Sequence, residues 1–130
     1  MRPYTVALFG EAEKGEYHIP YFCKTLSELV KYFGNPPDQS RGLFFAVQAI
    51  LYQRNLIFLR VEEEGYSTKD YLAGVNILKE HKLIPQVTAI CMPGVGEDQI
   101  LTAVKPICQK HHSFLITNEA DLYDYLSATF

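Results

Sequence analysis

The sequence has little net charge and no long hydrophobic run, and both deficits exclude classes of function. Its 130 residues contain 12 Lys and Arg against 15 Asp and Glu, a net charge of −3. This balance gives no general attraction to phosphate backbones or anionic lipid, so we expect neither nucleic acid nor a membrane as a partner. The longest apolar runs are about six residues, whereas a membrane span needs roughly 20. The amino-terminal residues show no signal-peptide pattern, which favours a cytoplasmic location.

Cysteine is scarce and badly spaced for a disulfide framework. Cys23, Cys91 and Cys108 are an odd, widely separated set without a CxxC motif, so we expect reduced thiols. Cys108 with His111 and His112 resembles a metal cluster. Helical spacing, however, puts Cys108 on an apolar face and the histidines at the negative end of a helix. Cys91 ends an apolar run, where burial makes a thiolate nucleophile unfavourable. We therefore predict no metal site, no cofactor and no catalytic set.

What is present suffices for one globular domain over residues 1–130. Hydrophobic residues make up 48% and charged residues 21%, which is enough apolar material to fill a core and argues against disorder. Four apolar runs predict strands, and two of them, 56–61 and 87–92, are nearly continuous, as in parallel strands that are covered on both faces. The other two are 4–9 and 114–117, and a short extended piece is expected at 19–23.

Helical patterns alternate with these strands. Thr25 and Glu28 form a capping box that predicts a helix over 26–33. Further apolar stripes predict helices over 42–53, from 67–68 through Leu78, over the 100–108 segment and after the cap residue Asn118. Lys79, His81 and Lys82 gather at the end of the helix that runs through Leu78. Pro106 predicts a kink or break in the helix over 100–108. The alternation predicts a three-layer α/β sandwich with a mostly parallel sheet of about four strands.

Two glycine-containing loops follow predicted strands, where open parallel sheets commonly bind ligands. The first offers Gly10, Glu11 and Lys14, and the second offers Gly94 and Gly96. Free amides before a helix suit an anion. Glu97 and Asp98, however, follow the second loop directly, and no third glycine, Lys or Ser/Thr completes a phosphate loop. A tight turn with acidic helix capping is the competing interpretation, and we favour it.

Several segments, in order, resemble the central α/β domain of phage-type contractile tail sheath proteins. Residues 8–15 are similar to the family's first strand and glycine-bounded turn, and Phe33-Gly34 to the end of its short helix. The remaining similar segments are 25–29, 46–48, 59–61, 71–74 and 92–94. The resemblance spans roughly residues 6–117, and the order of the segments carries it.

The chain also departs from the family pattern. Glu16 follows Gly15 where the family often has Gly-Pro, and Arg54-Asn55 stands where the family has paired glycines. Sheath subunits carry extended arms and a further domain, and we expect this chain to be too short to contain them. The resemblance implies a structural, self-assembling role without catalysis, in the cytoplasm or in a phage-like particle. The chain is then either a minimal stand-alone relative or a fragment.

Two functions from different classes follow. The first is a noncatalytic structural, assembly or protein-interaction module that binds itself or a larger assembly protein. The alternative is a small α/β ligand-binding or enzymatic domain that uses the loops after the first and third main strands. A pocket at those loops would favour the alternative, whereas an exposed sheet edge is a template for another chain.

Overall fold

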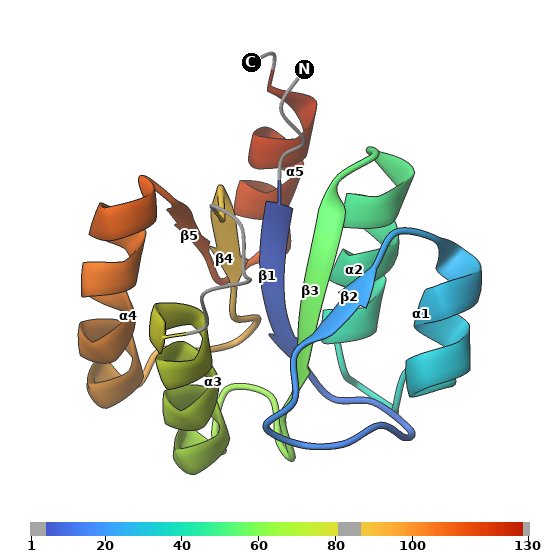
Figure 1. The fold of residues 1–130 in the computed structure, drawn as a ribbon, viewed down its shortest axis with the longest axis horizontal. Helices are drawn as coiled ribbons and strands as arrows, with labels where there is room; N and C mark the ends of the chain where they lie inside the picture. The colour runs from blue at the N-terminus through green and yellow to red at the C-terminus, as the bar shows by residue number, and fades with distance from the viewer. Residues whose placement is uncertain (1–4, 81–86, 129–130) are drawn as a thin grey trace.

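A five-stranded sheet forms the centre of the molecule (Figure 1). The structure, a computed structural model, describes residues 5–80 and 87–128. In chain order the strands are β1 (Thr5–Gly10), β2 (Tyr21–Cys23), β3 (Asn55–Arg60), β4 (Ala89–Cys91) and β5 (Phe114–Ile116). Across the sheet the order is β2-β3-β1-β4-β5, and every pair is parallel except β2 with β3. The predicted α/β class with a mostly parallel sheet is confirmed.

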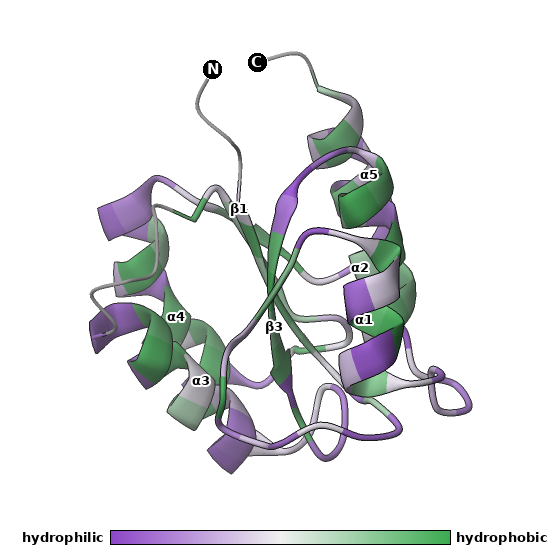
Figure 2. Ribbon diagram, turned by 45° about the vertical axis from the view of Figure 1, so that its right-hand side comes forward, coloured by the Kyte–Doolittle hydropathy of each residue, from purple (hydrophilic) through white to green (hydrophobic). Residues whose placement is uncertain are grey.

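Helices cover both faces of the sheet and complete the three layers (Figure 2). One face packs against α1 (Leu26–Phe33), α2 (Gly42–Leu51) and α5 (Glu119–Ser127). The other face packs against α3 (Thr68–Glu80) and α4 (Asp98–His111). The chain therefore has two apolar cores, one on each side of the sheet, as helix-covered parallel sheets require.

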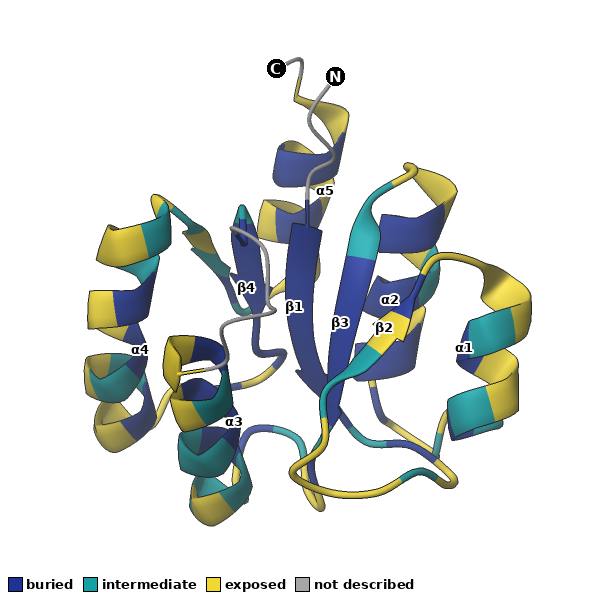
Figure 3. Cartoon of the chain, viewed as in Figure 1, coloured by how far each residue is buried: buried dark blue, intermediate teal, exposed yellow. Residues whose placement is uncertain are grey.

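The central position of β1 explains why its residues are apolar at successive positions. Val6 and Leu8 belong to the core under α1, α2 and α5, while Ala7 and Phe9 belong to the core under α3 and α4. All six residues of the strand are buried (Figure 3). Because both faces are covered, neither set of alternating side chains is free to be polar.

The capping residues predicted for α1 and α5 are confirmed. The Thr25 hydroxyl oxygen accepts from the Glu28 amide at 3.1 Å, and the Glu28 carboxylate accepts from the Thr25 amide at 3.2 Å. Asn118 caps α5 by accepting from the Asp121 amide at 2.8 Å. These bonds satisfy amides that the first turn leaves without helical partners.

One residue of the positive cluster predicted at the end of α3 lies within the described residues. Lys79 lies in its last turn, where a cation complements the helix dipole. His81 and Lys82 lie outside the described residues.

The strand count was too low in the sequence prediction. The short extended piece around 19–23 contains β2, which pairs with β3 in antiparallel register, Phe22 lying opposite Ile57. It is only three residues long and directly follows Pro20, so its pattern is too brief to mark a sheet strand. The long segment between β1 and β3 leaves room for β2 to run back along β3 before α1 begins.

Of the kink or break expected at Pro106, the break is wrong, because α4 continues from Asp98 to His111 through it. Pro106 is exposed, whereas Ile100, Val104 and Ile107 are buried against the sheet. A proline removes one helical hydrogen bond, and burial of the opposite face holds the helix together across that gap. Among the described residues, no helix combines the length and the apolar character that crossing a bilayer requires.

Candidate functional site

The two glycine loops leave the sheet at the same end, because β1 and β4 are parallel neighbours. The connection from β1 to β3 runs through α2 on one face, and the connection from β4 to β5 runs through α4 on the other. The direction of strand addition therefore reverses between β1 and β4. Open α/β sheets commonly bind ligands outside the carboxyl ends of the strands at such a reversal.

The carboxylate of Glu64 occupies the backbone donors at this reversal. Its Oε2 accepts from the amides of Glu11 at 2.8 Å and Gly42 at 2.9 Å, and its Oε1 accepts from Arg41 at 2.8 Å. Arg41 and Gly42 begin α2, so the charge also lies at the positive end of the helix dipole. In return, the Glu64 amide donates to the Glu11 carboxylate at 2.9 Å. The chain thus supplies its own anion at these donors.

Near Glu64 the backbone approaches itself closely at two pairs of glycines. A Cβ added at Gly10 would lie 2.7 Å from Cα of Gly42, and one added at Gly65 would lie 2.7 Å from the carbonyl oxygen of Gly94. Gly65 also has a φ of 87°, a conformation that favours glycine. The loop after β3 is therefore held directly against the loops after β1 and β4.

The structure brings together only part of the ligand-binding set that the sequence suggested, which was Gly10, Glu11, Lys14, Gly94 and Gly96. Gly10, Glu11 and Gly94 lie against the segment that carries Glu64 and Gly65. Lys14 is exposed, and its amide donates to the Phe33 carbonyl at 3.2 Å. A Cβ at Gly96 would meet no atom within 4 Å. Lys14 and Gly96 therefore stand apart from the other three.

The loop after β4 is a tight turn with an acidic cap, as the favoured interpretation predicted. Gly94 has a φ of 78°, and Glu97 is the N-cap of α4. One Glu97 oxygen accepts from the Gln99 amide at 3.3 Å, and the other accepts from the Thr68 hydroxyl at 3.4 Å. A carboxylate of the chain therefore lies at the start of this helix as well.

Arg60 fixes the loop after β1, a role that the sequence analysis missed. Its Nη1 donates to the Gly15 carbonyl at 2.6 Å and its Nη2 to the Ala12 carbonyl at 3.0 Å. The guanidinium carbon lies 4.4 Å from the ring centroid of Tyr17. Ala12 is buried, so part of this loop belongs to the core. The position of Arg60 at the end of an apolar strand was the available signal.

The cysteines lie in surroundings that suppress thiolate chemistry. Burial raises the pKa of Cys23 to about 12 and also raises the pKa of Cys91 and Cys108. Cys91 is fully buried, which confirms its predicted place in the core. Across residues 5–80 and 87–128, no three His, Cys, Asp or Glu side chains are grouped as metal ligands.

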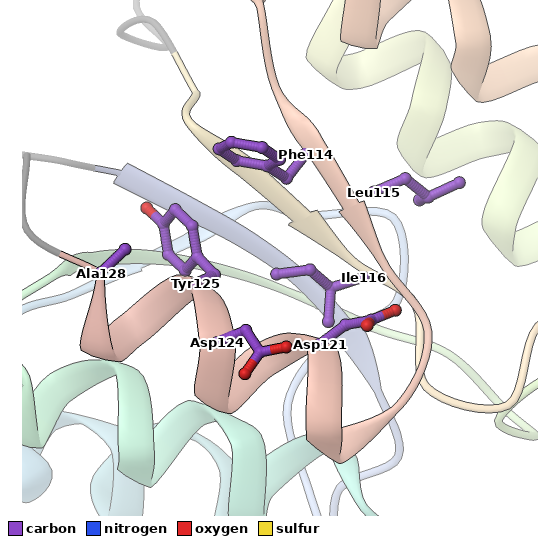
Figure 4. A pocket seen from close by; sticks show the side chains of 7 residues that line it. All are labelled: Phe114, Leu115, Ile116, Asp121, Asp124, Tyr125 and Ala128. Atoms are coloured by element: carbon purple, nitrogen blue, oxygen red, sulfur yellow. The ribbon is translucent and has the colours of Figure 1, made fainter.

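A hollow of about 380 Å³ lies between β5 and α5 (Figure 4). Its wall is mostly apolar, with two carboxylates from α5, and consists of Phe114, Leu115, Ile116, Asp121, Asp124, Tyr125 and Ala128. Phe114 is 57% exposed, and its ring centroid is 5.9 Å from that of Tyr125. Figure 4 shows Asp121 toward Ile116 and Tyr125 toward Phe114. The hollow thus has an aromatic part and an acidic part.

Tyr125 is a fixed wall of this hollow. Its hydroxyl lies 2.5 Å from the hydroxyl of Thr88, and the Arg54 guanidinium carbon lies 5.6 Å from its ring centroid. Burial is the main cause that raises its pKa, so the phenol stays neutral. Arg54 also donates from Nη2 to the Leu126 carbonyl at 3.3 Å. These contacts hold the ring in place before anything binds.

The hollow lies beside the outer edge of the sheet, because β5 is the last strand on that side. The Phe114 amide donates to the Thr88 carbonyl, and the Ile116 carbonyl accepts from the Met92 amide. Parallel pairing alternates along a strand, so Leu115, between these two residues, directs its amide and carbonyl away from β4. The edge therefore offers a backbone donor and acceptor to a further strand.

A second hollow, of about 320 Å³, lies between α2 and α5. It is lined by one carboxylate and otherwise by uncharged side chains, namely Phe44, Phe45, Gln48, Tyr52, Glu119, Leu122, Tyr123 and Leu126. Phe44 is 61% exposed and Tyr123 is 63% exposed. Large apolar side chains that line a hollow at the surface are typical of interaction sites.

Sequence reasoning placed Phe114 in a strand and Tyr125 on a helix face but did not find either hollow. The strand order decides which strand lies at an edge, and no local pattern encodes that order. The available signal was that 114–117 is the last predicted strand and is short. In comparisons with known proteins, the chain matches no protein-family model and has no significant match among curated proteins.

Proposed function

We propose that this chain is a noncatalytic assembly or protein-interaction module, which binds a second copy of itself and a larger assembly protein. The observation that carries the proposal is that exposed aromatic side chains line two hollows, one between α2 and α5 and one beside the open edge of β5. Both have the apolar character of protein contact sites.

The contacts of Glu64 support this function over small-molecule binding. The amides of Glu11, Arg41 and Gly42 already have a carboxylate partner. A phosphate or carboxylate ligand would have to displace that side chain and leave its charge without those bonds. The cost weighs against a nucleotide at the carboxyl ends of β1 and β4.

The hollow between α2 and α5 suits a second copy of the chain. Two copies related by a two-fold axis present the same patch to each other, so the patch must be compatible with itself. Glu119 is the one Asp or Glu that lines it, and Lys and Arg are absent from its lining. Apposition of two such patches therefore buries aromatic rings with little like-charge repulsion.

The resemblance to tail sheath domains supports an assembly role as well. The resembling segments include the strand that ends at Arg60 and the turn at Gly94, both of which order the carboxyl end of the sheet here. Under this proposal the chain works in the cytoplasm or in a phage-like particle, as one part of a larger assembly.

Sedimentation across about a hundredfold concentration range tests the proposal, since association depends on concentration. We expect the weight-average mass to rise with concentration. Calorimetry with ATP, GTP and NAD on the same preparation should give no binding heat. A strictly monomeric protein that binds one of these nucleotides at about micromolar affinity would overturn the proposal in favour of a ligand-binding domain.

A further inference from the structure

The two hollows differ in charge, and this difference assigns them different partners. The one between β5 and α5 contains Asp121 and Asp124, whereas its lining has no Lys or Arg. A second copy that presents the same patch brings two further carboxylates. Like charges oppose that encounter and opposite charges favour a basic partner.

We propose that the hollow between β5 and α5 binds an extended segment of a different, larger protein, which adds alongside β5 as a sixth strand and carries a large apolar side chain two residues away from a Lys or Arg. The inference rests on the proposed function, because it identifies the chemistry of the assembly partner. Strand addition at a sheet edge supplies affinity through backbone hydrogen bonds and specificity through alternate side chains.

The backbone of β5 provides the first half of this recognition. In an antiparallel arrangement, the outward amide and carbonyl of Leu115 pair with one residue of the incoming segment. The residues on either side of that partner point to one face of the sheet. The face that carries the hollow is the one toward which Phe114 and Ile116 point, because Ile116 packs in the core under α5.

The hollow provides the second half. Side chains two residues apart on a strand are about 7 Å apart and lie on one face. An apolar side chain of the segment fits against Phe114 and Tyr125, and a cation two residues away reaches Asp121 or Asp124. Asp121 also accepts from the Asn118 amide nitrogen Nδ2 at 3.1 Å, which fixes the position of its carboxylate.

Synthetic peptides test the proposal, and the absence of tryptophan from this chain makes them easy to read. Each probe is a nonapeptide with one Trp and one Lys two residues apart among Thr and Val, prepared in both orders, Trp before Lys and Lys before Trp. The Trp emission then reports only the peptide. We expect one or both orders to bind with a blue shift, and the affinity to fall with added salt.

Variants of the protein locate the bound peptide. The Asp121→Asn, Asp124→Asn double variant should weaken binding by about tenfold or more, since charge pairing is lost. Phe114→Ser should weaken it similarly through loss of apolar contact. The Glu62→Gln, Glu63→Gln double variant removes two exposed carboxylates that line neither hollow, so it is the matched control and should bind like the unaltered chain.

N-methylated peptides test strand addition itself. A methyl on the amide that faces Leu115 should abolish binding, whereas a methyl on the neighbouring amide, which points away from β5, should leave it unchanged. Equal effects of the two methyls, binding that ignores both variants, or failure of both peptide orders would each overturn the proposal. Self-association that persists in those cases would leave the proposed function standing with a different partner contact.

Discussion

At the residue scale, Glu64 joins three parts of the chain that are far apart in sequence. It lies in the loop after β3 and accepts from amides at the end of β1 and at the start of α2. Its own amide donates to the carboxylate of Glu11. Hydrogen bonds to a charged acceptor are stronger than neutral ones, so the Glu64 carboxylate ties the end of β1 and the start of α2 to the loop after β3.

Replacing Glu64 by Ala should lower the free energy of unfolding by about 2–3 kcal/mol, because three amides lose a charged acceptor. Glu64→Gln should cost less, since its amide oxygen still accepts from some of them. Urea denaturation monitored by circular dichroism measures the difference.

The adjacent Glu63 gives a matched control for that experiment. Glu63 is exposed, and the Ser67 hydroxyl bonds to its backbone amide and carbonyl rather than to its carboxylate. Glu63→Ala should therefore change stability by no more than about 0.5 kcal/mol. Equal effects of the two alanine substitutions would contradict the role given to the Glu64 carboxylate.

His111 should make stability depend on pH. Its Nδ1 accepts from the Val87 amide at 3.2 Å, and burial, followed by the charge of Lys110, lowers its pKa. The unfolded imidazole therefore binds a proton at a higher pH than the folded one. The contribution of the neutral His111 to stability is fully present above the unfolded pKa of about 6.5. It is lost as the pH falls below that value and through the folded pKa.

Melting temperatures of the unaltered chain and of His111→Gln, measured at intervals from pH 8 to pH 5, test this sign. We expect the unaltered chain to lose more stability than the variant as the pH falls, because glutamine does not titrate. Both proteins keep the Glu28 carboxylate, whose lowered pKa, caused chiefly by the Lys24 amide, acts only at more acidic pH. Parallel pH profiles would show that His111 does not carry the effect.

At the scale of elements, the strands near the centre bear most of the packing. Ile57 on β3 and Ile90 on β4 both flank β1 and are buried in the core under α3 and α4. Their neighbours on the opposite face are buried as well. A cavity at either position therefore lies between a sheet and a helix layer, where collapse is restricted.

Ile57→Ala or Ile90→Ala should each cost about 2–5 kcal/mol, from lost transfer free energy and the cavity left behind. Chemical denaturation gives the values. Val30→Ala on α1, where the side chain is 60% exposed, is the control and should cost less than about 0.5 kcal/mol. A loss below that value at both isoleucines would contradict their place in the core.

At the scale of the whole molecule, two hollows of different charge lie on either side of α5. The hollow with α2 has one carboxylate in its lining, while the hollow with β5 has two and adjoins an open strand edge. Under the two proposals above, the hollow with α2 serves self-association and the hollow with β5 serves the second protein.

Phe44→Ser should reduce self-association by about tenfold in the sedimentation experiment, because the Phe44 ring lines this hollow and is 61% exposed. Tyr66→Ser is the control, since Tyr66 is 74% exposed and lines neither hollow. It should leave association unchanged. If Tyr66→Ser reduced self-association and Phe44→Ser did not, the contact would lie outside the hollow between α2 and α5.

Much of the fold was predictable because its signals are local. The capping residues Thr25 and Asn118, the apolar strand around Ile57 and the buried Cys91 follow from short-range pattern and chemistry. The errors arose where a local signal was weak or overridden. β2 is too short to show a pattern, and burial of the far helix face outweighs the hydrogen bond lost at Pro106.

The sequence by itself determined the α/β class and the places of most helices and strands. It also determined that two glycine-containing loops follow strands of a mostly parallel sheet. Only the tertiary structure decided that Glu64 occupies the amides there, that β5 forms an edge, and that Phe114 meets Tyr125 beside two aspartates. The physical reason is range. Propensity, capping and hydrophobic periodicity act over a few residues, whereas strand order and the pairing of distant loops depend on how all elements pack together.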